Sequence, residues 1–198
     1  MAKNGGSTSH NGRVADSAEE ICPLLVDASI PDLQLTTTDR ETFDLNAAMA
    51  KKPTLLIFYR GGWCPFCNIH LAELQTIQDD LLEMGCQIIA ISVDRPEKLV
   101  ESQQEHQLTY TLLSDSAAVA IRAFGLAYKV SNASANNLKA NNMDIEKASA
   151  QTHHILPVPA AYIIGTDGVI KFEYINPNYK VRVKSDIILA APRAEIQV

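Results

Sequence analysis

The clearest pattern in the chain is a continuous apolar run from Thr54 to Tyr59, which is followed by a pair of glycines beginning at Gly61. A strand buried on both faces of a sheet has this composition, so the run predicts a central strand. Apolar residues then recur at helical spacing from Ile69 to Met84. This spacing predicts one long helix that begins near Pro65 and ends at Gly85.

Strands and helices continue to alternate along the chain. Gln87 to Val93 predicts a second buried strand, and Pro96 to about His106 predicts a second helix. Weaker patterns predict a short strand near residues 110–113, a helix near 117–124 and a closing helix over about 184–191. Alternation with short connections predicts an α/β fold in which helices cover a sheet, with catalytic groups beyond the carboxyl ends of the strands.

Two other segments predict β-structure around a turn: the first alternates apolar and polar residues, which suggests a short strand or hairpin, and the second joins two strand-like runs through the turn Gly165 to Gly168, which is typical of a β-hairpin. They are Ile30 to Leu45 and Ala160 to Tyr174. Residues 128–152 are rich in Asn, Ala and Ser, and we interpret them as an insertion whose structure the pattern does not specify. Residues 1–15 predict a flexible N-terminal tail, which leaves residues 16–198 as a single domain.

Composition narrows the range of partners. The chain has 198 residues, of which 46% are hydrophobic and 20% charged, and such a chain can fold as one domain without disulfides. Its net charge of -6 argues against coating nucleic acid or anionic lipid, so small molecules or other proteins are the expected partners. We expect a cytoplasmic protein, because the sequence has no apolar run long enough to cross a membrane and no secretory signal near its start.

Four cysteines stand at positions 22, 64, 67 and 86, and only Cys64 and Cys67 are close in sequence. If Pro65 is the first helical residue, Cys64 is the N-cap, where unpaired amides and the helix dipole favour a thiolate. Cys64 would then be the more exposed and more reactive sulfur, and Arg60 would lower its pKa further. Two alternatives are a zinc site that includes His70, for which a fourth ligand is missing, and a pair of inert buried cysteines.

The stretch from Phe58 to Cys67, FYRGGWCPFC, resembles the active-site segment of the peroxiredoxin-like branch of the alkyl hydroperoxide reductase and thiol-specific antioxidant family. Weaker similarity covers most of the chain, at residues 30–35, 88–93, 158–168 and 176–190. The resemblance implies a thioredoxin-like fold with a central mixed sheet flanked by helices, an N-terminal extension and an inserted segment. It also places Cys67 where the family carries its peroxidatic cysteine.

The chain departs from the family pattern around this cysteine. Arg60 and Cys64 stand where the family has a proline and a threonine or serine, and the family's distant arginine, which helps to hold thiolate and peroxide, aligns with Pro159. A CxxC motif preceded by Trp63 is instead similar to thioredoxins and glutaredoxins, which carry a cis-proline beside the dithiol. We therefore expect a cis bond between Val158 and Pro159, facing Cys64; a trans proline at the start of a strand is the alternative.

Three functions remain open. The first interpretation is thiol-disulfide exchange, in which Cys64 attacks a substrate disulfide and Cys67 resolves the mixed disulfide. The second is a thiol peroxidase, in which a hydroperoxide oxidises Cys67 to sulfenic acid and Cys64 condenses with it. The third is a non-catalytic redox sensor that uses the dithiol as a switch.

The two enzymatic functions imply similar partners. The expected substrate is a disulfide-bearing protein or a small hydroperoxide, and the expected reductant is of thioredoxin or glutaredoxin type. Neither a cofactor nor a metal is expected, and a homodimer is compatible with the sequence.

Other reactive side chains have simpler explanations. His153 and His154 precede the predicted second hairpin, but adjacent histidines are more typical of a solvated segment than of a catalytic pair. Cys86 is expected to be a buried residue, and Cys22 at most a distant resolving thiol.

Overall fold

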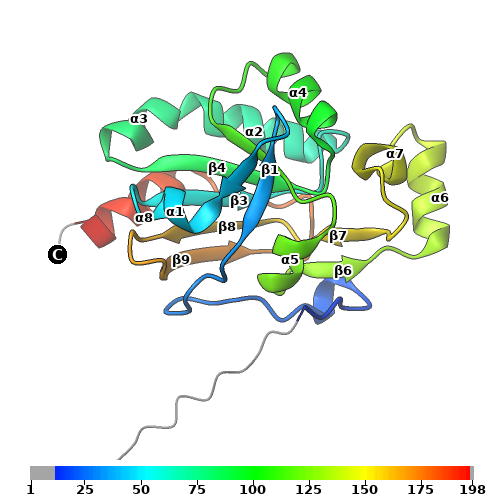
Figure 1. The fold of residues 1–198 in the computed structure, drawn as a ribbon, viewed down its shortest axis with the longest axis horizontal. Coiled ribbons are helices and arrows are strands. Elements are labelled where there is room, and N and C mark those ends of the chain that lie inside the picture. The colour runs from blue at the N-terminus through cyan, green and yellow to red at the C-terminus, as the bar shows by residue number, and fades with distance from the viewer. Residues whose placement is uncertain (1–11, 197–198) are drawn as a thin grey trace, which may run out of the picture.

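A seven-stranded mixed sheet forms the centre of the computed structural model, which describes residues 12–196 (Figure 1). Its strand order is β2-β1-β5-β4-β3-β8-β9, and β6 and β7 form a separate two-stranded sheet. The strands are β1 (Gln34–Thr37), β2 (Thr42–Asp44), β3 (Thr54–Phe58), β4 (Gln87–Ser92), β5 (Thr111–Ser114), β6 (Ala127–Lys129), β7 (Ile155–Pro157), β8 (Ala160–Ile164) and β9 (Ile170–Ile175).

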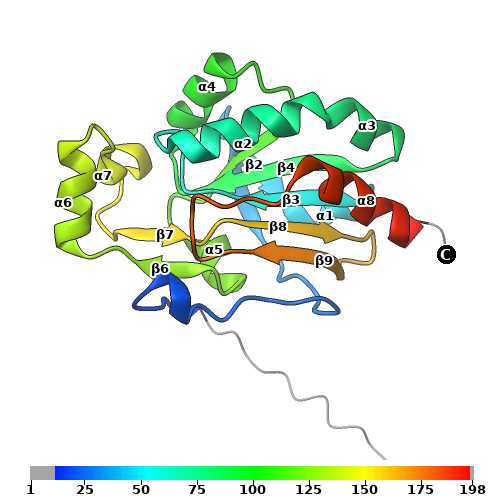
Figure 2. The ribbon, with the colours of Figure 1, turned by 180° about the vertical axis from the view of Figure 1, so that it is seen from behind.

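Helices lie on both sides of the large sheet, as comparison of Figures 1 and 2 makes clear. One face packs against α2 (Pro65–Thr76), α3 (Gln78–Glu83), α4 (Pro96–Glu105) and α8 (Ser185–Ile196). The other packs against α1 (Leu45–Met49) and α5 (Val119–Ala123). A short 3-10 helix, η1 (Ala18–Glu20), precedes β1, while α6 (Asn132–Ala140) and α7 (Ile145–Ser149) lie together at one end of the molecule.

The predicted central strand is β3, which pairs in parallel with β4 and antiparallel with β8. Side chains of a strand point alternately to the two faces of its sheet. Leu55 and Ile57 accordingly join the core beneath α2 and α3, and Leu56 and Phe58 join the core on the opposite face. Burial on both faces is therefore the reason for the unbroken apolar run.

The second buried strand and both predicted hairpins are present as β4, β1–β2 and β8–β9. The prediction of one continuous helix up to Gly85 is wrong, because the backbone turns out of helical geometry at Ile77 and separates α2 from α3. The amide side chains that flank this bend, Gln75 and Gln78, both hydrogen-bond to Thr109, which lies just before β5. These tertiary contacts fix a bend that helical periodicity alone does not reveal.

The segment interpreted as an insertion, residues 128–152, holds two short helices. Ser131 caps α6 by accepting a hydrogen bond from the Ser134 amide, and Asp144 caps α7 in the same way from Lys147. Polar residues rich in turn propensity therefore serve here as helix caps.

The predicted tail over residues 1–15 falls largely outside the described residues. Within its described part, Ala15 is buried and its amide donates a hydrogen bond to Ala127 O at 2.9 Å. The chain thus begins to pack beside β6 slightly before the predicted boundary. Across residues 12–196, no helix has the length and apolar character needed to span a membrane.

Candidate active site

The loop around Cys64 lies at the edge of the sheet where the parallel strands β3 and β4 both end. The chain leaves β3 through Arg60 and two glycines, and α2 begins with Pro65, so Cys64 is the N-cap of that helix. Figure 2 shows that α2 begins at the end of the molecule that also carries α6 and α7. The dithiol therefore lies at the carboxyl edge of the strands, where the alternation of strands and helices predicts catalytic groups.

Asp94, which follows β4, holds this loop in place. Its Oδ2 accepts a hydrogen bond of 2.6 Å from the Gly62 amide. Gly61 has a φ of +148°, and a Cβ at this residue would overlap the Trp63 indole and lie 2.6 Å from Asp94 Oδ1. Gly61 is thus required by backbone conformation and by close packing, and Gly62 by packing alone, since a Cβ there would lie 2.0 Å from Ser102 Oγ. Burial raises the pKa of Asp94 to about 7.

Cys64 and Cys67 are both buried, with exposed fractions of 1% and 0%. Cys64 is thus only marginally the more exposed of the two, and neither sulfur is open to solvent as the sequence suggested. Trp63 and Tyr179 pack against the buried cluster that contains both cysteines. Tyr179 lies beyond β9, and this long-range contact is the reason that local sequence overestimated the exposure of Cys64.

The two thiols form a hydrogen bond with each other and hold their protons unequally. The hydrogen bond from the Cys67 side chain, helped by the Cys67 amide and the charges of Arg60 and Arg182, lowers the pKa of Cys64 to about 6 in spite of burial. The same hydrogen bond, together with burial, raises the pKa of Cys67 well above its ordinary value. The directions of the two pKa shifts therefore favour Cys64 as the sulfur that carries the negative charge when the pair is singly ionised.

Arg182 is a site residue that the sequence analysis missed. Its Nη2 lies 3.4 Å from Cys67 Sγ, within hydrogen-bond distance of sulfur. Its Nη1 donates to the backbone oxygens of Tyr179 and Val181, so backbone carbonyls fix the direction of the guanidinium group. Arg182 follows Cys67 by 115 residues, and no local motif connects the two.

Arg60 is almost fully buried, with an exposed fraction of 6%. Its guanidinium carbon lies 5.0 Å from the centre of the Trp63 ring and 4.1 Å from that of Tyr179. Cation-π contacts of this kind stabilise a desolvated guanidinium. The positive charge held in this way lowers the pKa of Cys64, the direction that its sequence position suggested.

The expected cis bond between Val158 and Pro159 is wrong, since no cis peptide bond occurs among the described residues. Val158 is buried and its amide donates to Leu126 O at 2.9 Å, which continues the pairing of β6 and β7. Pro159 then leads directly into β8 in the trans form. It is the alternative case, a proline at the start of a strand.

The other candidate residues near the dithiol and in the core, His70 and Cys86, are both buried. His70 is buried one turn after Cys67, where burial and the charge of Arg182 lower its pKa to about 4 and keep it neutral. In the part of the chain that the structure describes, no three Cys, His, Asp or Glu side chains converge as a metal site would require. Cys86 is buried, as predicted.

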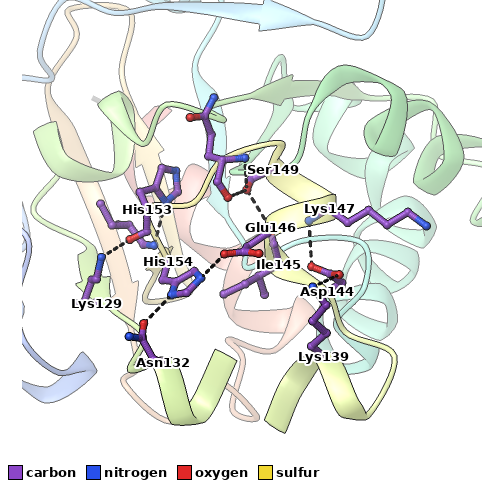
Figure 3. Close-up of polar contacts among 12 residues, drawn as sticks. Lys129, Asn132, Lys139, Asp144, Ile145, Glu146, Lys147, Ser149, His153 and His154 are labelled. Atoms are coloured by element: carbon purple, nitrogen blue, oxygen red, sulfur yellow. Dashed lines mark hydrogen bonds and ion pairs between the residues drawn. The ribbon is translucent and has the colours of Figure 1, made fainter. Parts of the chain in front are cut away.

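Of the two adjacent histidines, His154 contacts the α6–α7 segment, and His153 contacts residues outside it (Figure 3). His154 lies between Asn132 Oδ1 and Glu146 Oε1, at 3.2 and 2.8 Å. His153 Nε2 lies 2.8 Å from Ser116 O, and its Nδ1 accepts the amide of Ile155. Both imidazole rings are therefore hydrogen-bonded to polar groups of the fold.

Comparison with known proteins gives one family. A family model described as the AhpC/TSA family matches residues 26–173. Peroxiredoxin Bcp of Escherichia coli K12 is 26% identical over 167 residues, which are 84% of this chain and 94% of that protein. A putative peroxiredoxin bcp of Haemophilus influenzae is 29% identical over 104 residues, 52% of this chain and 66% of that protein.

Solved structures agree in fold. Reduced Prx3 from Vibrio vulnificus in complex with hydrogen peroxide superposes with a TM-score of 0.72 at 18% identity, covering 88% of this chain and 99% of that one. Peroxiredoxin Q of Xanthomonas campestris superposes with a TM-score of 0.66 at 17% identity, covering 86% of this chain and 99% of that one. At these identities the likeness concerns the fold alone.

Proposed function

The chain belongs to the AhpC/TSA family, is an oxidoreductase and has the thioredoxin-like fold, and from this premise we propose that it is a thiol peroxidase that reduces hydroperoxides. In this proposal Cys67 is the sulfur that the peroxide oxidises, and Cys64 is the sulfur that resolves it. Of the functions that the sequence leaves open, the peroxidase is the one that the names of the relatives favour over disulfide exchange.

The observation that carries the proposal is the contact between Arg182 Nη2 and Cys67 Sγ. In the family pattern a distant arginine helps to hold the thiolate and the peroxide, and here Pro159 occupies the aligned position. Arg182 reaches the same sulfur from the segment before α8. A guanidinium at this position can stabilise the Cys67 thiolate and the negative charge that develops on the departing peroxide oxygen.

The reaction has two steps. The Cys67 thiolate attacks one oxygen of ROOH, the O–O bond breaks, and the sulfur becomes a sulfenic acid while the other oxygen takes up a proton and leaves as ROH. Cys64 then attacks the oxidised sulfur, an S–S bond forms, and water leaves. One hydroperoxide is reduced to alcohol and water while two thiols become one disulfide.

The shared proton lets either cysteine carry the charge. In the resting pair Cys64 holds most of it, because the hydrogen bond with Cys67 lowers the pKa of Cys64 to about 6. Movement of that proton from Cys67 to Cys64 along the same hydrogen bond produces the thiolate that faces Arg182. Two interacting thiols titrate as a unit, so the apparent pKa near 6 belongs to the pair.

Both sulfurs are buried, so peroxide access requires local opening. Trp63 and Tyr179 are only partly buried and pack against the cluster around the dithiol, which makes them the side chains whose movement would expose it. Trp63 is also the single tryptophan of the chain, and its fluorescence can report on this movement and on the redox state of the neighbouring sulfurs.

Single-cysteine variants test the proposal. Cys67→Ser should lose peroxide consumption, whereas Cys64→Ser should still be oxidised once to a sulfenic acid that dimedone traps. Cys86→Ser, a buried cysteine outside the pair, is the matched control and should react like the wild type. Peroxide consumption by Cys67→Ser at the wild-type rate would refute the assignment of Cys67.

Thiol-disulfide exchange is the second candidate, and the lowered pKa of Cys64 favours it, because the thiolate is the attacking species. A wild-type protein that reduces insulin disulfides but leaves hydroperoxides intact would establish exchange in place of peroxidase activity. In either case a thioredoxin-type reductant is the expected source of electrons.

A further inference from the structure

Asp94 is a buried carboxyl beside the loop that leads to the dithiol. It follows β4, has an exposed fraction of 1%, and its Oδ2 accepts the Gly62 amide at 2.6 Å. The two-step peroxide reaction uses Cys64, Cys67 and Arg182 and requires nothing of this carboxyl. A buried ionisable group beside reactive sulfurs is nevertheless in a position to change their charge.

The carboxyl and the dithiol influence each other through their charges. Burial is the main cause that raises the pKa of Asp94 to about 7, and a thiolate at Cys64 raises it further by repulsion. Repulsion is mutual, so an ionised Asp94 disfavours a thiolate at Cys64. The buried side chain of Tyr59 interacts electrostatically with both Asp94 and Cys67. Carboxyl and thiols therefore belong to one buried cluster.

The two sulfurs have different charged neighbours. Arg182 attracts a thiolate at either sulfur, but it contacts Cys67, with Nη2 at 3.4 Å from Sγ. Arg60 attracts a thiolate at Cys64 and so acts against Asp94. When Asp94 is ionised, its charge repels the negative charge of the pair from Cys64, towards the sulfur that the Arg182 guanidinium contacts.

Asp94 also lines a cavity of about 210 Å³ between α4 and α7, together with Gly62 and Trp63. This space is large enough to hold water, through which a carboxyl can exchange its proton with solvent. Lys98 of α4 lines the same cavity and lowers the pKa of Asp94, against the effect of burial. The charged and titratable groups around Asp94 are Tyr59 just after β3, Cys64 in the loop, Lys98, Glu101 and Glu105 on α4, Asp144 before α7 and Lys147 on α7.

We propose that Asp94 is a positioning residue for the peroxidase reaction, whose ionised carboxylate selects Cys67 as the sulfur that carries the charge. The proton of Cys67 Sγ then passes to Cys64 Sγ along the hydrogen bond between them, and the thiolate forms beside Arg182. The proton only changes its sulfur, so this transfer needs no further reactant. The inference rests on the proposed function, because it explains how the sulfur that the peroxide oxidises becomes the ionised one.

Asp94→Asn tests the inference, because asparagine keeps an oxygen that can accept the Gly62 amide and does not ionise. Single-turnover oxidation of the reduced protein by hydrogen peroxide, followed by Trp63 fluorescence, gives a rate constant at each pH. In the wild type this rate constant should rise with the ionisation of Asp94, with a midpoint at about 7. In the variant it should follow the ionisation of the dithiol alone, with a midpoint at about 6.

The two proteins should also differ in the size of the rate constant. At a pH well above the midpoint Asp94→Asn should react about threefold more slowly, which corresponds to a bias of roughly half a pKa unit between the sulfurs. At a pH well below the midpoint Asp94 is protonated, and the two proteins should react alike. A merely structural role of the carboxyl would instead lower the rate constant at every pH.

Asp115→Asn and Lys98→Gln are the comparison variants. Asp115 is another buried carboxyl with a raised pKa, but it accepts the backbone amides of Val119 and Ile121 in α5, so its variant should keep the wild-type midpoint. Lys98→Gln leaves Asp94 in place and removes a charge that lowers the pKa of this carboxyl. Its midpoint should move to higher pH, with the wild-type rate constant above it.

Limited alkylation of the reduced proteins with iodoacetamide measures the charge distribution without peroxide. Above the midpoint, the ratio of label on Cys67 to label on Cys64, measured by peptide mass spectrometry, should fall about threefold in Asp94→Asn and stay unchanged in Asp115→Asn. An unchanged ratio in Asp94→Asn, or an equal change in Asp115→Asn, would overturn the inference. A wild-type protein that leaves peroxide intact would refute the proposed function instead, and the labelling ratio would still decide the role of Asp94.

Discussion

Replacement of Arg182 by methionine removes the guanidinium group that contacts Cys67 Sγ while keeping an unbranched side chain of similar length. In the wild-type protein the donor atom lies 3.4 Å from the sulfur and two backbone carbonyls fix its direction. The contact is stronger when the sulfur is a thiolate, and it persists as charge develops on the peroxide. The variant should therefore bind peroxide poorly and react slowly.

The size of the effect follows from the nature of the contact. A hydrogen bond to a charged group contributes about 1.5–3 kcal/mol. Arg182 is only half-buried, so solvent screens part of its charge and the lower end of this range applies. About 1.5 kcal/mol corresponds to a roughly tenfold reduction in the rate constant for oxidation by peroxide.

Stopped-flow fluorescence of Trp63 gives that rate constant when reduced protein is mixed with excess hydrogen peroxide. Lys184→Gln is the matched control, because it removes one exposed positive charge from the same segment without touching the dithiol. We expect the control to react within about twofold of the wild type, as remote exposed charges contribute little. A similar rate for Arg182→Met and wild type, or an equal loss in the control, would refute the role given to Arg182.

Three further predictions, one of them with a matched control, test the surroundings of the site and the core. Burial raises the pKa of Asp94 from 3.8 to about 7, so the folded state binds the Asp94 proton more tightly than the unfolded state does. The free energy of unfolding should therefore fall as the pH rises through this interval. In urea denaturation, Asp94→Asn should show a smaller fall in the free energy of unfolding over the same pH range. Gly61→Ala should lower the free energy of unfolding by about 1–3 kcal/mol, since its backbone conformation and its contact with Trp63 leave no room for a Cβ. Phe124→Ala should lower the free energy of unfolding by about 3–5 kcal/mol, because the ring is fully buried. Phe66→Ala is the control and should lower it by under about 1 kcal/mol, because Phe66 has an exposed fraction of 38%. Equal losses of stability in the two variants would contradict the assigned core.

The sheet could be predicted because its signal is local. The apolar run that becomes β3 indicates burial on both faces of the sheet, and the alternating residues of the first hairpin indicate burial on one face; each pattern is complete within a few residues. The position of the dithiol at the start of a helix follows from Gly61 and Pro65 in the same way. The local sequence therefore correctly predicted Cys64 as the N-cap of α2.

The parts that the sequence did not reveal all depend on contacts between distant segments. Arg182 reaches Cys67 across 115 residues, and Tyr179 covers the dithiol from the same distant segment, so neither the arginine nor the burial of Cys64 has a local signature. The cis bond expected at Pro159 came from an analogy with other dithiol proteins. Pairing of the preceding residue, Val158, with Leu126 gives an ordinary trans entry to β8 instead.

Peptide mapping of the wild-type protein after one equivalent of hydrogen peroxide tests the central claim most directly. The account predicts that the intact protein loses the mass of two hydrogen atoms, that the bond joins Cys64 to Cys67, and that Cys86 still reacts with a thiol reagent once the protein is unfolded. A disulfide that instead involves Cys22, or a stable sulfenic acid on Cys67 with Cys64 still reduced, would contradict it.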